Sequence, residues 1–368
     1  MTQKMIRWGF LGTANIARKN WQAIHNTGNS VLTGVASRDL SKAERFIAEC
    51  QASVPVPILP KAYGSYESLL ASNEIDAVYI PLPTGLRKDW VIRAAESGKH
   101  VVCEKPCAVH LSDLVEMTSA CKRHGVQFMD GVMFVHGARM QRLREVLAEG
   151  KTIGKIRRIT SQFSFLGDEG FVADNIRSRS NLEPQGCLGD LGWYSIVFAL
   201  ECLQGRMPRR VRGQFLSRFG SPESPAQIPS EFSAELLYDD GVSASFYCSF
   251  VTENQQWANI SGTQGYLHVP DFVLPFFGCE AALEINRPEF KVTGCHFSME
   301  SHPQRLAVSE YSNNHPSAQE TRLFRTFAEQ VARGGLRSDW PERALKTQQL
   351  LEICLESASH DGKWISLQ

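Results

Sequence analysis

The sequence predicts two domains: a doubly wound α/β domain with a parallel sheet, followed by an α+β domain with an antiparallel sheet. Between residues 6 and 130, short apolar runs alternate with stretches of helical spacing, which is typical of βαβ units. Beyond about residue 150, apolar and polar residues alternate with period two, and glycine and proline recur at short intervals. The length of 368 residues suits two domains.

The parallel sheet is predicted from five apolar runs, and its helices from the segments between them. The predicted strands are Ile6–Leu11, Val31–Ala36, Ala77–Leu82, His100–Cys103 and Val126–Met129. The predicted helices include Ser41–Cys50, Leu86–Ser97 and Leu111–His124. A further helix is expected to begin after the glycine turn that ends the first strand.

The antiparallel part is predicted most clearly at Gln162–Phe165 and Val242–Tyr247, where alternate residues are apolar. Helices are predicted within it at Leu188–Leu203 and at residues 316–334 and 341–358. We place the domain boundary near residue 130 and expect a connecting helix at Met140–Leu147.

The composition excludes several classes of protein. Hydrophobic residues make up 43% of the chain and charged residues 21%, which argues against disorder and coiled coils. The 39 basic and 39 acidic side chains cancel, so neither nucleic acid nor a membrane surface is an expected partner. No apolar run approaches the roughly 20 residues of a membrane span, and no signal-peptide core is recognisable. We therefore expect a cytoplasmic protein.

The ten cysteines form no CxxC pair and no Cys/His cluster at zinc-finger spacing. Reduced thiols are expected rather than a disulfide framework. Cys103 and Cys107 are interpreted as packing residues, because the sequence identifies no base that would activate either thiol. Without an HExxH motif or clustered carboxylates, no metal is expected.

A dinucleotide site is predicted where the first strand ends. Read from Gly12, the turn is G-x-A-x-x-A, a relative of the G-x-G-x-x-G/A turn whose glycines let the backbone approach a pyrophosphate at a helix N-terminus. Ala14 adds a methyl group where the phosphate comes close, but the turn follows a strand and opens a helix, as the motif requires. The expected cofactor contacts here are Gly9, Gly12, Thr13, Ala14, Asn15 and Ile16.

The residues after the second strand favour NADP over NAD. A carboxylate at this position accepts from the ribose 2′-hydroxyl of NAD, whereas an arginine pairs with the 2′-phosphate of NADP. The chain has Ser37 and Arg38, which offer a hydroxyl and a guanidinium to that phosphate. Asp39 comes one position late for the carboxylate role, and either Asp39 or Ser41 could cap the next helix.

The strand His100–Cys103 ends in Glu104, Lys105 and Pro106. Ligands of open α/β sheets bind at the carboxyl ends of strands, so Lys105 is expected to point at the cofactor cleft. With the glycine turn, Tyr79–Thr84 and Gly189–Tyr194, this tripeptide resembles the Gfo/Idh/MocA oxidoreductase family in order and spacing. The chain is most similar to the branch containing dimeric dihydrodiol dehydrogenase, NADP-dependent D-xylose dehydrogenase and glucose-fructose oxidoreductase.

The resemblance implies an NAD(P)-binding Rossmann domain in residues 1–130. It also implies an α+β C-terminal domain in residues 131–368, with an open, mostly antiparallel sheet for substrate binding and dimerisation, and so a homodimer or higher homo-oligomer. The implied catalytic residues are Lys105, Tyr194 and Asp190. The implied cofactor contacts are Pro81, Leu82, Pro83, Thr84, Glu104, Lys105, Pro106 and, from the second domain, Arg177.

Two segments depart from the family pattern. Where relatives often have Asn followed three residues later by His, this chain has Thr84 and Arg87. Where relatives often carry an Arg-Phe-x-Pro segment, it has Phe134–Ala138, in which we interpret His136 as structural. Both departures concern the substrate side and leave the cofactor prediction unchanged.

Hydride transfer to or from a nicotinamide requires the protein to handle one proton on the substrate oxygen. Asp190 and Tyr194 are four residues apart, so a helix would place both on one face. Tyr194 could exchange the proton, with Lys105 as the cation that favours the phenolate, or Lys105 could act itself. The sequence does not decide between them.

The predicted function is an NADP(H)-dependent oxidoreductase acting on a hydroxyl or keto group of a sugar, polyol or similar small molecule. One alternative is a trans-dihydrodiol dehydrogenase, with Phe163, Phe165 and Phe171 as candidates for an apolar pocket. The other is a catalytically silent, dinucleotide-binding regulator, against which the presence of Lys105 argues.

Overall fold

The computed structural model describes residues 4–367, and the chain divides into two compact units. The first unit contains the chain up to Gly137 together with residues 181–184 and 313–348. The second contains residues 138–180, 185–312 and the chain from Gln349 on. Each unit is thus discontinuous in the sequence. The assignment of cofactor binding to residues 1–130 and of substrate binding to residues 131–368 stays a prediction.

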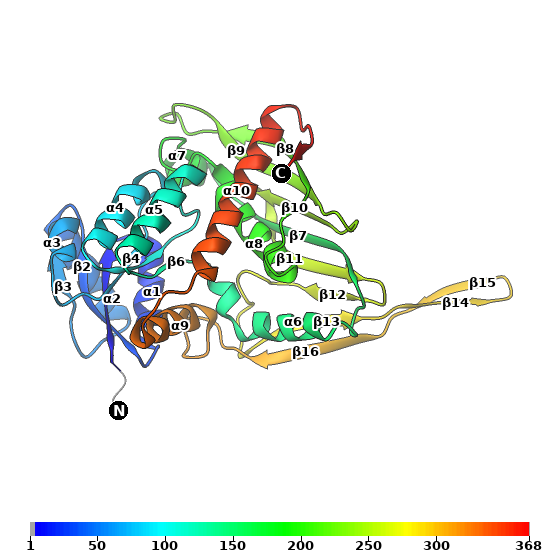
Figure 1. Cartoon of the computed structure of the whole chain (residues 1–368), viewed down its shortest axis with the longest axis horizontal. Helices are drawn as coiled ribbons and strands as arrows, with labels where there is room; N and C mark the ends of the chain where they lie inside the picture. The colour runs from blue at the N-terminus through cyan, green and yellow to red at the C-terminus, as the bar shows by residue number, and fades with distance from the viewer. Residues whose placement is uncertain (1–3, 368) are drawn as a thin grey trace. The chain divides into compact units, whose positions relative to one another are not determined.

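A six-stranded parallel sheet forms the centre of the first unit, in the order β3-β2-β1-β4-β5-β6 (Figure 1). Its strands are β1 (Ile6–Leu11), β2 (Ser30–Ala36), β3 (Lys61–Tyr63), β4 (Ala77–Ile80), β5 (His100–Cys103) and β6 (Phe128–Asp130). The strand order reverses between β1 and β4, which makes the carboxyl ends of these two strands the place where such sheets bind ligands. The doubly wound parallel sheet is confirmed.

The helices of the first unit lie between these strands and near the end of the chain. They are α1 (Asn15–His25), α2 (Leu40–Ser53), α3 (Tyr66–Leu70), α4 (Thr84–Glu96), α5 (Leu111–Arg123), the 3-10 turn η1 (Met133–His136), α9 (Gln319–Arg333) and the first part of α10 (Asp339–Ser359). The predicted helices are all present, with ends that differ by a few residues. The three-residue strand β3 and the one-turn α3 were not predicted, because elements this short carry little periodicity.

Helix α9 was predicted in the second domain, but it packs on the parallel sheet of the first unit. Trp8 of β1 meets Phe324 edge to face, with ring centroids 5.1 Å apart, and Tyr79 of β4 meets the same ring at 5.7 Å. These residues are almost fully buried. The amphipathic pattern of α9 predicts that the helix covers an apolar surface, but it does not say which one, and the partner lies about three hundred residues earlier.

The second unit is built on a nine-stranded sheet in the order β16-β13-β12-β11-β7-β10-β9-β8-β17. The strands are β7 (Ile156–Leu166), β8 (Arg210–Phe219), β9 (Ile228–Leu237), β10 (Ser243–Ser249), β11 (Val251–Gly262), β12 (Tyr266–Val269), β13 (Glu280–Asn286), β16 (Pro303–Ser309) and β17 (Ile365–Ser366). Among the described strands of this sheet, only β10 and β7 pair in parallel, so the predicted open, mostly antiparallel sheet is confirmed.

Several helical segments accompany this sheet. They are α6 (Ala138–Glu149), α7 (Glu169–Asp174), η2 (Ile176–Ser178), the π turn η3 (Leu188–Gly192), α8 (Trp193–Cys202) and the last part of α10. Within residues 4–367, no helix is both long and apolar enough to cross a membrane.

A two-stranded hairpin, β14 (Glu289–Thr293) with β15 (His296–Glu300), continues β13 and β16 and projects from the nine-stranded sheet (Figure 1). Phe290 pairs with Met299 and Val292 with Phe297, so these four side chains share one face of the hairpin. All four are more than half exposed. The hairpin therefore carries an apolar face that the described chain does not cover.

Candidate active site

The carboxyl ends of β1 and β4 meet at Gly12. Gly12 has a φ of 123° and donates its N–H to the carbonyl of Ala36 at 3.0 Å. A Cβ at this position would lie 3.2 Å from the Leu82 side chain, which belongs to the segment after β4. The backbone angle therefore favours glycine here, and a side chain would also crowd Leu82. The structure brings the predicted contacts Gly12, Pro81 and Leu82 together at the switch point of the sheet.

Helix α1 begins directly after this turn. Ala14 has extended backbone angles, and the N–H of Ala17 donates to its carbonyl at 2.9 Å. No side chain of the described residues caps this helix, and its first turn holds no acidic residue. The remaining N–H groups and the positive end of the helix dipole suit a pyrophosphate. Asn15 and Ile16 are exposed there, and Thr13 and Ala14 are partly exposed.

Gly9 has a different local role. It lies within β1, and a Cβ there would come within 2.7 Å of the Leu69 side chain and 3.2 Å of Ile75. Its lack of a side chain lets α3 and the following loop pack against the strand. The structure thus gives Gly9 a packing role, while its contribution to cofactor binding stays a prediction.

The end of β2 presents Ser37 and Arg38. Asp39 is the N-cap of α2: its Oδ1 accepts the Ser41 N–H at 3.0 Å and the Ser41 hydroxyl at 2.8 Å. These hydrogen bonds lower the pKa of Asp39. Ser37 is buried, whereas the Arg38 side chain is exposed. Of the two predicted caps, the structure selects Asp39, and the neighbouring Arg38 side chain is exposed.

Glu104, at the end of β5, is held from two sides. One carboxylate oxygen accepts from the Tyr79 hydroxyl at 2.5 Å, and the other accepts from the N–H of Lys105 at 3.2 Å. Burial, together with the Glu104 charge, raises the pKa of Tyr79 well above its ordinary value. A Cβ on Gly131 would sit 3.1 Å from the carboxylate, so glycine makes room for it. These contacts fix the Glu104 carboxylate and, through it, the backbone N–H of Lys105.

Thr84 and Arg87, which form the first departure from the family pattern, both lie in α4. Arg87 is 5% exposed, and its guanidinium donates to the carbonyls of Leu82 at 2.7 Å, Glu104 at 3.0 Å and Pro106. Thr84 donates its N–H and hydroxyl to the two carboxylate oxygens of Glu183, at 3.0 and 2.6 Å. Neither side chain faces open solvent, so both organise the segments after β4 and β5.

Sequence reasoning missed Glu183, and it assigned no role to Tyr79 or Gly131. Glu183 is 99 residues from its partner Thr84, and no local motif joins them. Arg87 carried a signal, because it stands where relatives place another residue type, but its carbonyl partners are not readable from the chain.

In the second unit, Asp190 lies in the π turn η3 and Tyr194 in the first turn of α8. The Trp193 N–H donates to the Leu188 carbonyl five residues earlier. The predicted helix over 188–203 is therefore present, but it opens with a π turn, a feature frequent at functional sites. A Cβ on Gly192 would lie 2.7 Å from Leu188.

Arg177 and Asp190 pair with each other, with Nε 2.8 Å from Oδ2. The Arg177 backbone is itself fixed, because its N–H donates to the Asn175 side chain at 3.0 Å. Tyr194 is 7% exposed, and its ring meets Phe163 edge to face at 5.6 Å. The second unit therefore holds two contacting pairs, Arg177 with Asp190 and Tyr194 with Phe163.

Of the three phenylalanines considered for an apolar pocket, only Phe163 contacts Tyr194 in the described interactions. Phe165 and Phe171 meet each other at 5.2 Å and both pack on the buried Phe250. They are partly buried and form an aromatic cluster of their own with Phe250 in the second unit.

The cysteines are free thiols, and Cys103 and Cys107 are fully buried. Burial raises the pKa of Cys107 well above its ordinary value, which keeps it protonated and unreactive. The interpretation of both as packing residues agrees with this environment.

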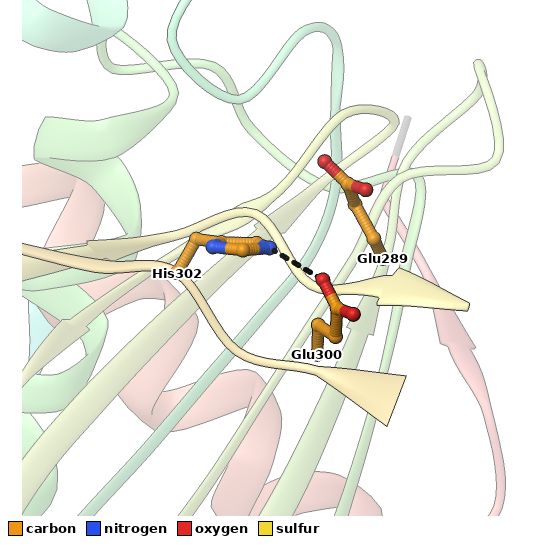
Figure 2. A group of neighbouring side chains, drawn as sticks. All are labelled: Glu289, Glu300 and His302. Carbon is orange, nitrogen blue, oxygen red and sulfur yellow. Dashed lines mark ion pairs between the residues drawn. The ribbon is translucent and has the colours of Figure 1, made fainter. Parts of the chain in front are cut away.

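Among the described residues, one group of side chains has donor atoms close enough to hold a metal ion: Glu289 and Glu300, at the two ends of the projecting hairpin, and His302 just after it (Figure 2). Glu300 lies 3.6 Å from His302, and the ammonium of Lys291 is 2.6 Å from Glu300 and 3.8 Å from Glu289. A lysine ammonium pairs with both carboxylates, so the group is explained as a surface ion-pair cluster.

Comparison with known proteins places these observations in a family. Residues 6–132 match the model of the Gfo/Idh/MocA oxidoreductase family with an NAD-binding Rossmann fold, and residues 140–268 match the Gfo/Idh/MocA C-terminal domain. The chain belongs to this family, as its motifs predict.

Two curated relatives and one solved structure indicate the range within the family. A D-xylose 1-dehydrogenase (NADP(+)) of Haloferax volcanii is 34% identical over 260 residues, covering 71% of this chain and 74% of the relative. The trans-1,2-dihydrobenzene-1,2-diol dehydrogenase of Mus musculus is 30% identical over 288 residues, covering 77% and 80%. The aldose-aldose oxidoreductase of Caulobacter crescentus has the same fold, with a TM-score of 0.81 at 20% identity over 99% of this chain and 100% of that one.

Proposed function

We propose that the chain is an NADP(H)-dependent oxidoreductase that transfers a hydride between the nicotinamide and a carbon bearing a hydroxyl or keto group. The proposed substrate class is a sugar, a polyol or a related small molecule. The observation that carries the proposal is the edge of the parallel sheet, where Gly12, Arg38, Leu82 and Lys105 follow the carboxyl ends of four neighbouring strands. Family membership and the relative that is an NADP-dependent xylose dehydrogenase support it.

The residues present fit a bound dinucleotide. The left-handed Gly12, the uncapped start of α1 and the small Ala14 suit the pyrophosphate. Arg38 suits a 2′-phosphate, because Asp39, the neighbouring carboxylate, is engaged in capping α2. When bound, the nicotinamide supplies or accepts the hydride. The proposed contacts after β4 and β5 are Pro81, Leu82, Pro83, Thr84, Glu104, Lys105 and Pro106.

The proposed catalytic residues are Lys105, Tyr194 and Asp190. As an alcohol is oxidised, the hydride leaves its carbon and the hydroxyl proton passes to a base, and reduction reverses both transfers. The Tyr194 hydroxyl and the Lys105 amine are the two candidates for that proton. Asp190 is a supporting residue in this proposal, held in place by Arg177, whose approach to the cofactor also remains proposed.

A trans-dihydrodiol dehydrogenase is the second candidate function. It is favoured by the mouse relative and by the aromatic ring of Phe163 against Tyr194. An apolar wall beside the proposed proton donor would suit a cyclic diol, although aromatic faces also pack on the apolar faces of sugars.

The proposal includes a homo-oligomer that forms through the C-terminal sheet. The exposed apolar face of the hairpin formed by Phe290, Val292, Phe297 and Met299 supports it, because the hairpin extends that sheet. A cytoplasmic location is also proposed, supported by ten free cysteines.

The first experiment is a fluorescence titration of the protein with NADPH and NADH, followed by assays with aldoses, cyclic polyols and a trans-dihydrodiol. Tight NADPH binding with turnover of an aldose or polyol supports the proposal. Turnover of the dihydrodiol alone transfers support to the second candidate. Binding without turnover of any class favours the silent regulator, and binding of neither nucleotide contradicts all three.

A further inference from the structure

We propose that Arg87 is a positioning residue, which fixes the backbone on both sides of Lys105. Its guanidinium donates to the carbonyl of Glu104 at 3.0 Å and to that of Pro106, the residues directly before and after Lys105. A third hydrogen bond, 2.7 Å long, runs to the carbonyl of Leu82 in the segment after β4. One side chain thus joins the two segments that follow neighbouring strands.

The burial of Arg87 makes this arrangement specific. The side chain is 5% exposed, so a guanidinium here is retained only with its donors satisfied. Its planar fork can address carbonyls in several directions at once, whereas a lysine ammonium is a point donor on a flexible stem. Leu82 and Pro106 are buried and Glu104 is partly buried, and replacing Arg87 removes a hydrogen bond from each of these three carbonyls.

The helical turn that carries Arg87 is itself held by hydrogen bonds. We call Arg87 and its three hydrogen bonds to Leu82, Glu104 and Pro106 the brace. Arg87 lies in the first turn of α4, and that turn begins with Thr84. Glu183 accepts both the N–H and the hydroxyl of Thr84, and the same hydroxyl lies 3.4 Å from the carbonyl of Pro106. Glu183 therefore holds the first residue of α4, and the start of this helix lies against the Glu104–Pro106 segment.

Functionally, the brace sets the position of the Lys105 side chain relative to the loop after β4. Glu104 contributes from the other side, because its carboxylate accepts the Lys105 N–H at 3.2 Å. A reacting group displaced by about 1 Å can lose two orders of magnitude in rate. This inference rests on the proposed function in one respect only: that Lys105 acts in catalysis.

The test compares Arg87→Lys and Arg87→Gln with Arg93→Gln. Arg93 is a matched control, since it is an arginine of the same helix but pairs at the surface with Glu67 at 2.9 Å. Two measurements are made on folded protein, with folding checked by circular dichroism. The first is hydrogen exchange of the peptide covering residues 103–108, and the second is kcat beside the Kd for NADPH.

We expect exchange at the Lys105 segment to rise about tenfold or more in both Arg87 variants and to stay unchanged in Arg93→Gln. We expect kcat to fall about tenfold or more while the Kd for NADPH rises less than about threefold. Arg87→Lys is not expected to restore either quantity, because a lysine ammonium is a point donor that does not replace the guanidinium fork. If Arg87 acted through charge or volume alone, lysine would restore both. If Arg87→Gln does not fold, Arg87→Lys carries the test.

Unchanged exchange in the Arg87 variants overturns the inference, whatever the activity. Exchange that rises equally in Arg93→Gln also overturns it, since the effect would then belong to α4 as a whole. Wild-type kcat in Arg87→Lys overturns it as well. If the wild-type protein turns over no substrate class, the proposed function fails, but a selective rise in exchange still supports the brace.

Discussion

Arg177 and Asp190 form an ion pair in which Nε lies 2.8 Å from Oδ2, and the Asp190 side chain is 13% exposed. The sequence predicts separate roles for them, a cofactor contact for the arginine and catalytic support for the aspartate. The structure makes them partners. Asp190 lies in a π turn rather than in an ordinary helical turn. The guanidinium beside it is well suited to hold its carboxylate in one orientation.

The first prediction concerns this pair. Arg177→Gln is expected to lower kcat by about tenfold, because Asp190 loses its charged partner, and to raise the Kd for NADPH as well, because Arg177 is also a proposed cofactor contact. Arg179→Gln is the matched control, since Arg179 pairs at 2.9 Å with the well exposed Glu223. A rise in Kd without a fall in kcat would instead identify Arg177 as mainly a cofactor contact. Steady-state kinetics and fluorescence titration separate the two results.

The second prediction concerns the choice of cofactor. Arg38→Ala is expected to remove a preference for NADPH over NADH of at least about tenfold, equal to about 1.4 kcal/mol, because the 2′-phosphate loses its guanidinium. Asp39→Ala, one residue on, is the control: it should cost about 1 kcal/mol of stability through the lost cap of α2 and leave the preference intact. A preference that survives Arg38→Ala would show that another group reads the phosphate.

Local pattern predicts the strands and helices around the parallel sheet because each element is dictated by the spacing of its own apolar residues. It also predicts a glycine turn after the first strand, and the structure agrees, because Gly12 has a φ of 123° and a Cβ there would lie 3.2 Å from Leu82. What it does not predict depends on residues distant in the chain. Two such contacts are the packing of Phe324 on Trp8 and the hydrogen bond that the Thr84 hydroxyl donates to Glu183.

The π turn before α8 could not be predicted for a different reason. A helical pattern over 188–203 is the same whether its first turn has α or π hydrogen bonds. Only the structure shows the π pattern, in which the Trp193 N–H donates to the Leu188 carbonyl. Arg87 lies between these cases: its departure from the family pattern marks it, but only the structure shows that it serves three carbonyls.

The third prediction concerns pH. Burial lowers the pKa of His100 to about 4, and its Nδ1 accepts the N–H of Gln127 at 2.9 Å. Between pH 6.5 and 4 the unfolded chain binds a proton that the folded protein refuses, so the free energy of unfolding falls as the pH falls through this window, by at most about 3 kcal/mol. Asp76 stays ionised throughout, because its own pKa is about 2.

His100→Asn keeps an acceptor near Gln127 and removes the titration, so its unfolding free energy should depend less on pH between 6.5 and 4 than that of the wild type. His124→Asn, at the exposed end of α5, is the control and should follow the wild type. Urea unfolding at a series of pH values measures both. Parallel curves for His100→Asn and the wild type would contradict the assignment.

The fourth prediction concerns the buried pair of Arg139 and Asp271 in the second unit. Both side chains are 7% exposed, and Asp271 also accepts the N–H of Phe276 at 2.7 Å. Arg139→Met leaves a buried carboxylate without its cation and is expected to cost about 3–5 kcal/mol. Arg142→Gln, in the same helix with an exposed partner, should cost less than about 0.5 kcal/mol. A loss equally small in Arg139→Met would mean that Asp271 is satisfied by other donors.

The last prediction concerns the proton of the proposed reaction. If Tyr194 carries it, Tyr194→Phe abolishes turnover, whereas Lys105→Met lowers kcat and moves the basic limb of the pH profile, because the cation that favours the phenolate is gone. If Lys105 carries it, Lys105→Met abolishes turnover, and Tyr194→Phe retains a measurable rate with the same pH profile as the wild type.

The ring of Tyr194 packs on Phe163, so phenylalanine preserves this contact and isolates the hydroxyl. We expect the first result, because Tyr194 stands beside the Asp190 turn and is 7% exposed, which suits a group that meets its substrate away from bulk water. Equal kcat in both variants and the wild type would remove both residues from the chemistry.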